Sequence, residues 1–295
     1  MSHQTLISAA ALQSLLAKNQ PLVLLDCGFD LSDTQAGQRA YEAGHLPHAR
    51  YAHLDRDLSS AKTGRNGRHP LPARGDLAWT LAQWGIAPGV QVVTYDDQAM
   101  PYAARAWWLL RWMGHRDVAV LDGGRAAWAR VGGTLVIDAP PTIDAAAPYP
   151  ATATPGMPSI DADGLLALLG QPQLRLLDAR AAERFRGEVE PLDPVAGHIP
   201  GATQRFFKDN LGSDGCFKPA EQLRAEFAAT LATTADVPAQ DSGVIHQCGS
   251  GVTACHNLLA MSHAGWDPTA LYSGSWSEWC SDARRPMVKG SASAP

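Results

Sequence analysis

The segment from Val244 to His256 has the residue types and the spacing needed for covalent chemistry. It reads Val-Ile-His-Gln-Cys-Gly-Ser-Gly-Val-Thr-Ala-Cys-His, so a short apolar run ends at Cys248 and a helix-like segment follows at once. Backbone N–H groups in such a turn can converge on the sulfur, and the N-terminus of the helix adds partial positive charge. Both effects favour the nucleophilic thiolate. The sequence predicts a reactive Cys248, with a buried structural cysteine as the alternative.

The two glycines beside the central serine support the reactive interpretation. Gly249 and Gly251 bracket Ser250, and glycine permits the positive φ angles that a tight cradle of amides requires. We therefore expect the backbone of this loop to bind an anion at the end of a strand.

Composition limits the classes of protein to which the chain can belong. Its 295 residues are 45% hydrophobic and 18% charged, which is typical of a globular protein. This length fits two domains of about 100–150 residues each. A net charge of −5 gives no general attraction to nucleic acid or to an anionic membrane. The five cysteines contain no C-x-x-C pair, so neither a zinc ribbon nor a thioredoxin-type motif is supported.

We also expect the chain to have no targeting signal. The first residues lack a basic region followed by an apolar one. The most apolar stretch, Ala103–Met113, is interrupted by Arg105 and Arg111 and is too short to cross a bilayer. We predict a soluble cytoplasmic protein with reduced thiols, no membrane contact and no nucleic-acid partner.

The chain repeats itself after about 150 residues. Four matches follow one another in the same order: 24–26 with 176–178, 43–49 with 196–202, 90–94 with 243–247, and 121–128 with 272–279. The sequence therefore predicts two copies of one domain, 1–138 and 159–295, joined by a Pro-rich linker, 139–158. Ser8 and Ser159 are predicted to cap the first helix of each copy.

Each half alternates short apolar strands with helical stretches. The predicted strands are 22–25, 90–95 and 118–121 in the first half, and 174–177, 243–247 and 270–272 in the second. This alternation predicts an α/β fold in which each domain has a mainly parallel sheet with helices on both faces. Ligands of such sheets bind beyond the carboxyl ends of the strands, which is where Cys248 lies.

Comparing the two halves separates features of the fold from features of the chemistry. The turn that matches the Cys248 loop, 95–102, has no cysteine and offers carboxylates instead. We predict that the first domain is catalytically inactive and that the second is the catalytic one.

The motifs resemble those of the rhodanese family, specifically its two-domain sulfurtransferases, over nearly the whole chain. The motifs that carry the resemblance are Leu-Asp-x-Arg at 177–180, Gly-His-Ile-Pro-Gly-Ala at 197–202, Cys-Gly-Ser-Gly-Val-Thr-Ala at 248–254 and Ser-Gly-Ser-Trp-Ser-Glu-Trp at 273–279. The resemblance implies two tandem rhodanese-like domains and a sulfane sulfur carried as a persulfide on Cys248. It implies no metal and no organic cofactor.

The loop also resembles one group within that family. Thiosulfate-preferring members carry basic residues directly after the cysteine, whereas the neutral loop here is similar to that of 3-mercaptopyruvate sulfurtransferases. The resemblance implies that 3-mercaptopyruvate is the donor, that pyruvate is released, and that a thiol such as thioredoxin, or cyanide, is the acceptor. Thiosulfate stays open as the alternative donor.

Further site residues are implied by the same resemblance. Arg184 would bind the donor carboxylate through a forked pair of hydrogen bonds. The second arginine of the family is expected after Glu190-Pro191, but Leu192 stands there, so Arg186 is the candidate substitute.

The remaining predicted site residues lie in the loop and in the first half. The backbone of Gly249, Gly251, Val252 and Thr253 would bind the substrate and the sulfur, and Ser250 would bind the reacting sulfur or relay a proton. Asp55 and His69 are the family's cleft residues in the first half.

Two other functions would use a similar loop. A cysteine phosphatase of the Cys-x5-Arg type needs an arginine six positions after the cysteine, where Ala254 stands. A non-catalytic rhodanese-like binding module would lack the reactive cysteine. Two complementary domains in one chain predict a monomer.

Overall fold

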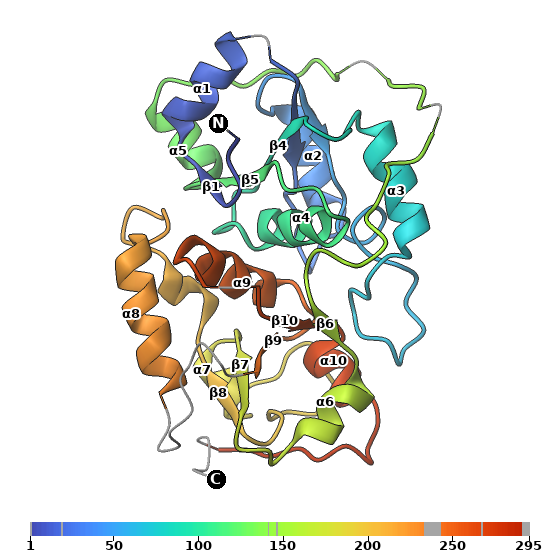
Figure 1. Cartoon of the computed structure of the whole chain (residues 1–295), viewed down its shortest axis with the longest axis vertical. Helices are drawn as coiled ribbons and strands as arrows, with labels where there is room; N and C mark the ends of the chain where they lie inside the picture. Colours follow the sequence, from blue (N-terminus) through green and yellow to red (C-terminus); the bar gives the residue numbers. More distant parts are fainter. Residues whose placement is uncertain are drawn as a thin grey trace. The chain divides into compact units, whose positions relative to one another are not determined.

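The chain folds into two compact units (Figure 1). The computed structural model describes residues 2–18, 20–140, 142–145, 147–232, 243–266 and 268–290. Unit 1 comprises Met1–Ser60, Leu71–Gly156 and Ser213–Phe217, and unit 2 comprises Ala61–Pro70, Met157–Gly212 and Lys218–Pro295. Each unit thus includes a short segment from the opposite half of the sequence. The predicted domains, 1–138 and 159–295, do not include this exchange of segments.

Unit 1 is built on a five-stranded sheet in the order β1-β5-β4-β2-β3, and every neighbouring pair is parallel. The strands are β1 (Leu6–Ile7), β2 (Leu22–Asp26), β3 (Ala49–Tyr51), β4 (Gln91–Tyr95) and β5 (Val118–Leu121). The helices are α1 (Ala9–Ala17), α2 (Ala36–Ala43), α3 (Arg74–Gln83), α4 (Pro101–Trp112) and α5 (Gly124–Arg130).

Unit 2 repeats this plan with a parallel sheet in the order β6-β10-β9-β7-β8. Its strands are β6 (Ser159–Ile160), β7 (Leu174–Asp178), β8 (Ala202–Gln204), β9 (Gly243–Gln247) and β10 (Ala270–Tyr272). Its helices are α6 (Ala162–Leu168), α7 (Ala182–Phe185), the 3-10 helix η1 (Phe207–Asn210), α8 (Ala220–Leu231), α9 (Thr253–His263) and α10 (Ser275–Trp279). The predicted α/β fold with two tandem parallel sheets is confirmed.

The strand order explains why helices cover both faces of a sheet. In unit 1 the connections through α1 and α2 cross the sheet in one direction, and those through α3 and α4 cross it in the other. Because crossovers between parallel strands are right-handed, the two pairs of helices lie on opposite faces. The central strands are therefore buried on both sides and read as continuous apolar runs, as in Val118–Leu121, where every residue is fully buried.

The starts of the two first helices show one correct prediction and one error. Ser8 caps α1, and its Oγ accepts a hydrogen bond from the amide of Ala11 at 3.2 Å. Ser159 is not a cap, because Ser159–Ile160 forms the edge strand β6 on β10. Asp161 caps α6 instead and accepts from the amide of Gly164 at 2.8 Å. The chain must complete its pairing with β10 before the helix can begin.

The described part of the Pro-rich segment packs onto unit 1. The amide of Tyr149 donates to the carbonyl of Ala78 at 2.9 Å, and that of Gly156 donates to the carbonyl of Trp112 at 3.1 Å. Within the described ranges, no helix combines the length and the apolar composition that crossing a membrane would require.

We expect His246 in β9 to make unit 2 sensitive to acid. Its ring is fully buried, and neither ring nitrogen has a hydrogen-bond partner among the described residues. Burial lowers the pKa of His246 from 6.5 to about 3. Below pH 6.5 the unfolded chain therefore binds a proton that the folded chain does not, so stability falls as the pH falls.

The test is urea denaturation of the wild type and of His246→Leu at about pH 7.5 and about pH 5. Between these two pH values the wild type should lose about 2 kcal/mol more unfolding free energy than the variant. Equal losses in the two proteins would show that His246 does not cause the sensitivity.

Candidate active site

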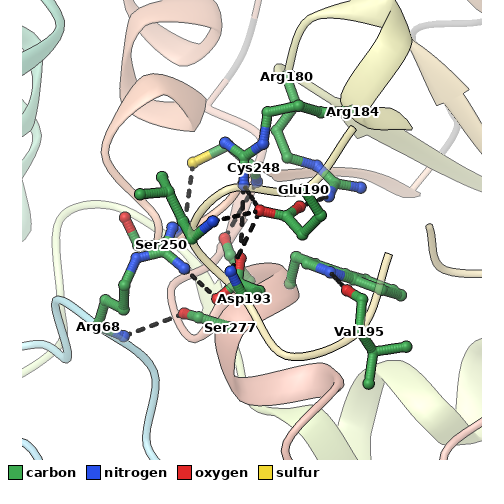
Figure 2. Close-up of polar contacts among 12 residues, drawn as sticks. Arg68, Arg180, Arg184, Glu190, Asp193, Val195, Cys248, Ser250 and Ser277 are labelled. Atoms are coloured by element: carbon green, nitrogen blue, oxygen red, sulfur yellow. Dashed lines mark hydrogen bonds and ion pairs between the residues drawn. The ribbon is translucent and has the colours of Figure 1, made fainter. Parts of the chain in front are cut away.

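Cys248 lies directly after β9, in the loop that leads into α9, and only 2% of the residue is exposed. Its Sγ accepts a hydrogen bond from the backbone amide of Ser250 at 3.4 Å (Figure 2) and another from that of Gly251 at 3.2 Å. Two amides thus converge on the sulfur, as the loop sequence predicts. This arrangement stabilises a negative charge on Sγ, because both amides present their positive ends to it.

Gly251 lets the loop turn tightly enough for this contact. Its φ is +77°, and a Cβ at this position would lie 2.3 Å from the carbonyl oxygen of Ser273. Both the left-handed conformation and the close approach exclude a side chain.

The turn before α10 holds the loop from behind. The Oγ of Ser275 accepts from the amide of Cys248 at 3.1 Å. The amides of Trp276 and Ser277 donate to the carbonyls of Cys248 and Gly249, each at 3.0 Å. These bonds fix the backbone on both sides of the sulfur, which explains why the Ser-Gly-Ser-Trp motif accompanies the cysteine loop.

Helix α9 begins immediately after the loop. Val252 occupies its N-cap position and Thr253 is its first residue. Helix dipoles favour negative charge near their N-termini, so α9 supports the same charge as the two amides. Cys255 lies in this helix, fully buried, as expected for a cysteine of the core.

A histidine contacts the serine of the cysteine loop. The Nδ1 of His69 is 2.8 Å from the Oγ of Ser250, and both residues are buried. His69 belongs to the segment Ala61–Pro70, which is part of unit 2. The structure therefore places His69 and Ser250 in contact, next to Cys248.

The segment that carries His69 is docked by its backbone. Gly67 has a φ of +83°, and a Cβ there would approach the carbonyl oxygen of Gly274 to 2.8 Å. The amide of Arg68 donates to the Oγ of Ser277 at 3.0 Å. The same turn that supports the cysteine loop thus also positions Arg68 and His69.

An ion-pair network surrounds Arg184, the predicted substrate-binding residue. Its Nη2 donates to Glu190 at 2.7 Å and lies 3.4 Å from Asp193. Glu190 also accepts from the amides of Leu192 and Asp193 and lies 3.5 Å from Arg180. The carboxyl groups thus hold the Arg184 guanidinium in place.

Arg180 anchors this network to the sheet. It pairs with Asp178, the last residue of β7, at 2.7 Å, and its guanidinium lies 5.0 Å from the centre of the Trp276 ring. Although burial acts in the opposite direction, Asp178 and Glu190 keep the pKa of Arg180 raised. Arg180 is therefore a permanent positive charge within the network.

Arg68 is a site residue that sequence reasoning missed. Its guanidinium pairs with Asp193 (Figure 2). Like the guanidinium of Arg184, it also lies near the Cβ position of Gly249. The only signal in the sequence is its place beside His69, because nothing in the spacing indicates which loop residues reach the cysteine.

Other predicted residues lie differently. Arg186 forms a two-bond ion pair with Glu188 at the surface, at 2.6 and 2.9 Å. Leu192 is 42% exposed. Asp55 belongs to unit 1, where its amide donates to the Nδ1 of His53 at 3.1 Å, and its role at the Cys248 site stays a prediction.

The corresponding loop of unit 1 holds an anion of its own. Asp96 follows β4 directly, as Cys248 follows β9, and Tyr95 pairs with Asp26 in the register in which Gln247 pairs with Asp178. The predicted match of 90–94 with 243–247 is therefore wrong by one residue. Sequence similarity between short apolar strands does not fix their register, whereas the pairing with the neighbouring strand does.

The carboxylate of Asp96 accepts hydrogen bonds from the amides of its own loop. Its two oxygens accept hydrogen bonds from four backbone amides at 2.8–2.9 Å, those of Gln98, Met100, Tyr102 and Ala103. Burial raises the pKa of Asp96 to about 6, although the four amides act to lower it. Where unit 2 has a sulfur, unit 1 has a carboxylate that fills the cradle.

Comparisons with known proteins agree with the repeat. A sequence profile described as "Rhodanese-like domain" matches the chain twice, at residues 8–131 and 161–282. The chain is 50% identical to the "Probable 3-mercaptopyruvate sulfurtransferase" of Pseudomonas aeruginosa, over 98% of this chain and 100% of that protein. It is 32% identical to the "Thiosulfate sulfurtransferase" of Mus musculus, over 95% and 94% of the two chains.

A solved structure has a similar fold. The 3-mercaptopyruvate sulfurtransferase from Leishmania major superposes with a TM-score of 0.76 at 28% identity, covering 96% of this chain and 76% of that one. Among the residues described here, no group of three or more His, Cys, Asp or Glu side chains could hold a metal ion.

We expect Gly251→Ala to make Cys248 a poorer nucleophile. The new methyl group would collide with Ser273, so the loop must shift and the amide of Gly251 must leave the sulfur. Alkylation of Cys248 by iodoacetamide, followed by peptide mass spectrometry, should slow about tenfold.

Gly201→Ala is the matched control, because Gly201 has a φ of +76° with nothing within 4 Å of its Cβ position. It imposes the same backbone strain without the collision and should leave alkylation unchanged within about twofold. If both variants slow the reaction equally, the close approach to Ser273 is not the cause.

Proposed function

The chain belongs to the rhodanese family, and we propose that it is a sulfurtransferase that takes a sulfane sulfur from 3-mercaptopyruvate and passes it to a thiol or to cyanide. The carrier would be a persulfide on Cys248. The observation that carries the proposal is the sulfur of Cys248, held by the amides of Ser250 and Gly251 beside the Ser250–His69 pair.

In the first half-reaction the Cys248 thiolate attacks the thiol sulfur of 3-mercaptopyruvate. A new S–S bond forms and the C–S bond of the donor breaks. The electron pair of that bond moves onto the leaving group, which departs as the enolate of pyruvate. The loop amides stabilise the sulfur anion before and after the transfer, in the way that an oxyanion hole stabilises a developing charge.

The leaving group needs a proton, and the Ser250–His69 pair supplies a path for it. The proton carried by the donor thiol passes through the Oγ of Ser250 and the imidazole of His69 and reaches the methylene carbon of the enolate. The 2.8 Å contact between the Ser250 Oγ and the His69 Nδ1 is within hydrogen-bond reach. The products are pyruvate and the Cys248 persulfide anion.

In the second half-reaction a thiolate or cyanide attacks the outer sulfur of the persulfide. The S–S bond breaks, the acceptor keeps the sulfur, and Cys248 returns as a thiolate. Thioredoxin is a thiol of this class. Because the first half-reaction leaves a stable covalent persulfide and the second restores the free cysteine, the kinetics are those of double displacement.

Thiosulfate is the second candidate donor, because a relative bearing the name thiosulfate sulfurtransferase matches nearly the whole chain. The loop itself favours 3-mercaptopyruvate. Its residues after Cys248 are uncharged, whereas the sulfonate of thiosulfate is bonded directly to the transferred sulfur and benefits from cations within the loop.

The two domains have different proposed roles. The second domain carries the chemistry, and the first, whose loop is filled by Asp96, is catalytically inactive. Asp55 stays a proposed catalytic residue. The backbone of Gly249, Val252 and Thr253 would bind donor and persulfide with the amides already named. We further propose a monomer that works in the cytoplasm without a metal or an organic cofactor.

The donor preference is tested by steady-state kinetics and by mass spectrometry of the protein after each donor. We expect kcat/KM to be at least about tenfold higher for 3-mercaptopyruvate than for thiosulfate. Cys248 should gain the mass of one sulfur atom, and the control variant Cys248→Ser should gain none. No added sulfur with either donor would refute the proposed function, and a preference for thiosulfate would refute the choice of donor.

The proton path predicts a difference between the donors. Ser250→Ala and His69→Gln should each lower kcat/KM for 3-mercaptopyruvate by about 100-fold, because the enolate needs a proton. Sulfite leaves thiosulfate as a stable dianion and needs none, so the same variants should change the thiosulfate reaction by less than about fivefold. Equal losses with both donors would contradict the path.

A further inference from the structure

We infer that Arg68 binds the donor carboxylate together with Arg184 and so supplies the second arginine that the sequence lacks at Leu192. The inference rests on the proposed function, because it concerns the carboxylate of the proposed donor. It assigns a substrate-binding role to a residue that the sequence motifs do not identify.

The two guanidinium groups meet at the residue next to the nucleophile. A Cβ built on Gly249 would lie 2.8 Å from the Nη2 of Arg68 and 3.5 and 3.6 Å from the two terminal nitrogens of Arg184. Arg68 comes from the segment Ala61–Pro70 and Arg184 from α7, so two separate parts of unit 2 bring their charges to one point. Glycine at position 249 leaves the space that this approach requires.

Both arginines keep hydrogen-bonding capacity after their ion pairs are made. Arg68 uses its Nη1 on Asp193, and Arg184 uses its Nη2 on Glu190 and Asp193. The Nε atoms of Arg68 and Arg184 are buried and have no partner among the described residues. A buried N–H of a cation without an acceptor is costly, and a bound carboxylate would provide one.

The position of Arg68 is fixed before any substrate binds. Its backbone amide donates to Ser277, and Gly67 before it packs on Gly274. Its side chain is 23% exposed, which leaves one side open to a ligand, and Asp193, at 3% side-chain exposure, holds the other end. Such an arrangement costs little conformational entropy on binding.

Arg186, the substitute predicted from the sequence, is less suited to this role. The Nε–Nη2 edge of its guanidinium is engaged with Glu188, and its side chain is 37% exposed. The atoms nearest to the Cβ position of Gly249 belong to Arg68 and Arg184, not to Arg186. The geometry therefore favours Arg68 as the partner of Arg184.

Two guanidinium groups beside Gly249 also suit the shape of the donor. In 3-mercaptopyruvate two carbon atoms separate the carboxylate carbon from the sulfur, so the anion lies away from Cys248 when the sulfur is in line for transfer. Planar guanidinium groups bind a carboxylate through forked hydrogen bonds, which lysine cannot do.

The test compares Arg68→Met, Arg68→Lys and the control Arg65→Met, whose arginine lies exposed in the same loop. Double-displacement kinetics give separate kcat/KM values for the donor and for an uncharged acceptor, dithiothreitol. Arg68→Met should lower the value for 3-mercaptopyruvate about 30-fold, as expected for a lost charge-assisted hydrogen bond. Arg68→Lys should give an intermediate loss, because it restores charge without the fork.

The acceptor measurement separates binding from a structural effect. A substrate-binding role leaves kcat/KM for dithiothreitol within about threefold of wild type, whereas a displaced His69 or cysteine loop would lower both values together and overturn the inference. A donor value for Arg68→Met within about twofold of Arg65→Met would overturn it as well.

Failure of the proposed function would be visible separately. The wild type would then acquire no sulfur from 3-mercaptopyruvate at all, whereas failure of the Arg68 inference leaves that reaction of the wild type intact.

Discussion

The site depends on one physical interaction, the convergence of backbone amides on an acceptor atom at the end of a parallel strand. In unit 2 the acceptor is the sulfur of Cys248, and in unit 1 it is the carboxylate of Asp96. Amides can point inward only if the loop turns sharply and its outer side is braced, which explains Gly251 and the Ser273–Ser277 turn. Proteins leave very few buried amides unpaired, so the cradle must contain an acceptor at all times. The chemistry of each domain then follows from which acceptor the chain supplies.

The two units thus show one fold with and without a reactive group. A carboxylate that accepts four amides satisfies the loop and cannot take up a sulfane sulfur. The sulfur of Cys248 satisfies the same need less completely, because this larger and softer atom receives two amides, at 3.2 and 3.4 Å. In a persulfide the negative charge would lie on the outer sulfur, one atom farther from the backbone. The remaining donors of the loop, of Ser250 and of the helix N-terminus could bind it there. If Cys248 carries a persulfide as proposed, its loop would serve two charge positions, whereas the Asp96 loop serves one.

Much of this organisation could be predicted from the sequence, because it depends on local patterns. The repeat, the parallel sheets, the position of Cys248 after a strand and the family resemblance all follow from apolar runs, glycines and short motifs. The error at Ser159 and the one-residue shift at Asp96 arise where pairing with a distant strand decides the outcome. The position of Arg68 could not be predicted for a similar reason. Its contact with Asp193 joins residues 125 positions apart, and the segment that carries it folds with the opposite half of the chain. Backbone docking at Gly274 and Ser277 determines which of several loop arginines lies beside Gly249, and no local pattern encodes this docking.

The most direct test of the central claim is a crystal structure of the protein after reaction with 3-mercaptopyruvate. A second sulfur atom should be bonded to the Sγ of Cys248, within hydrogen-bond distance of the loop amides, while Asp96 keeps its four amides and is unchanged. A transferred sulfur on any other cysteine, or a Cys248 persulfide directed away from the loop amides, would contradict the claim that this cradle holds the sulfur during transfer.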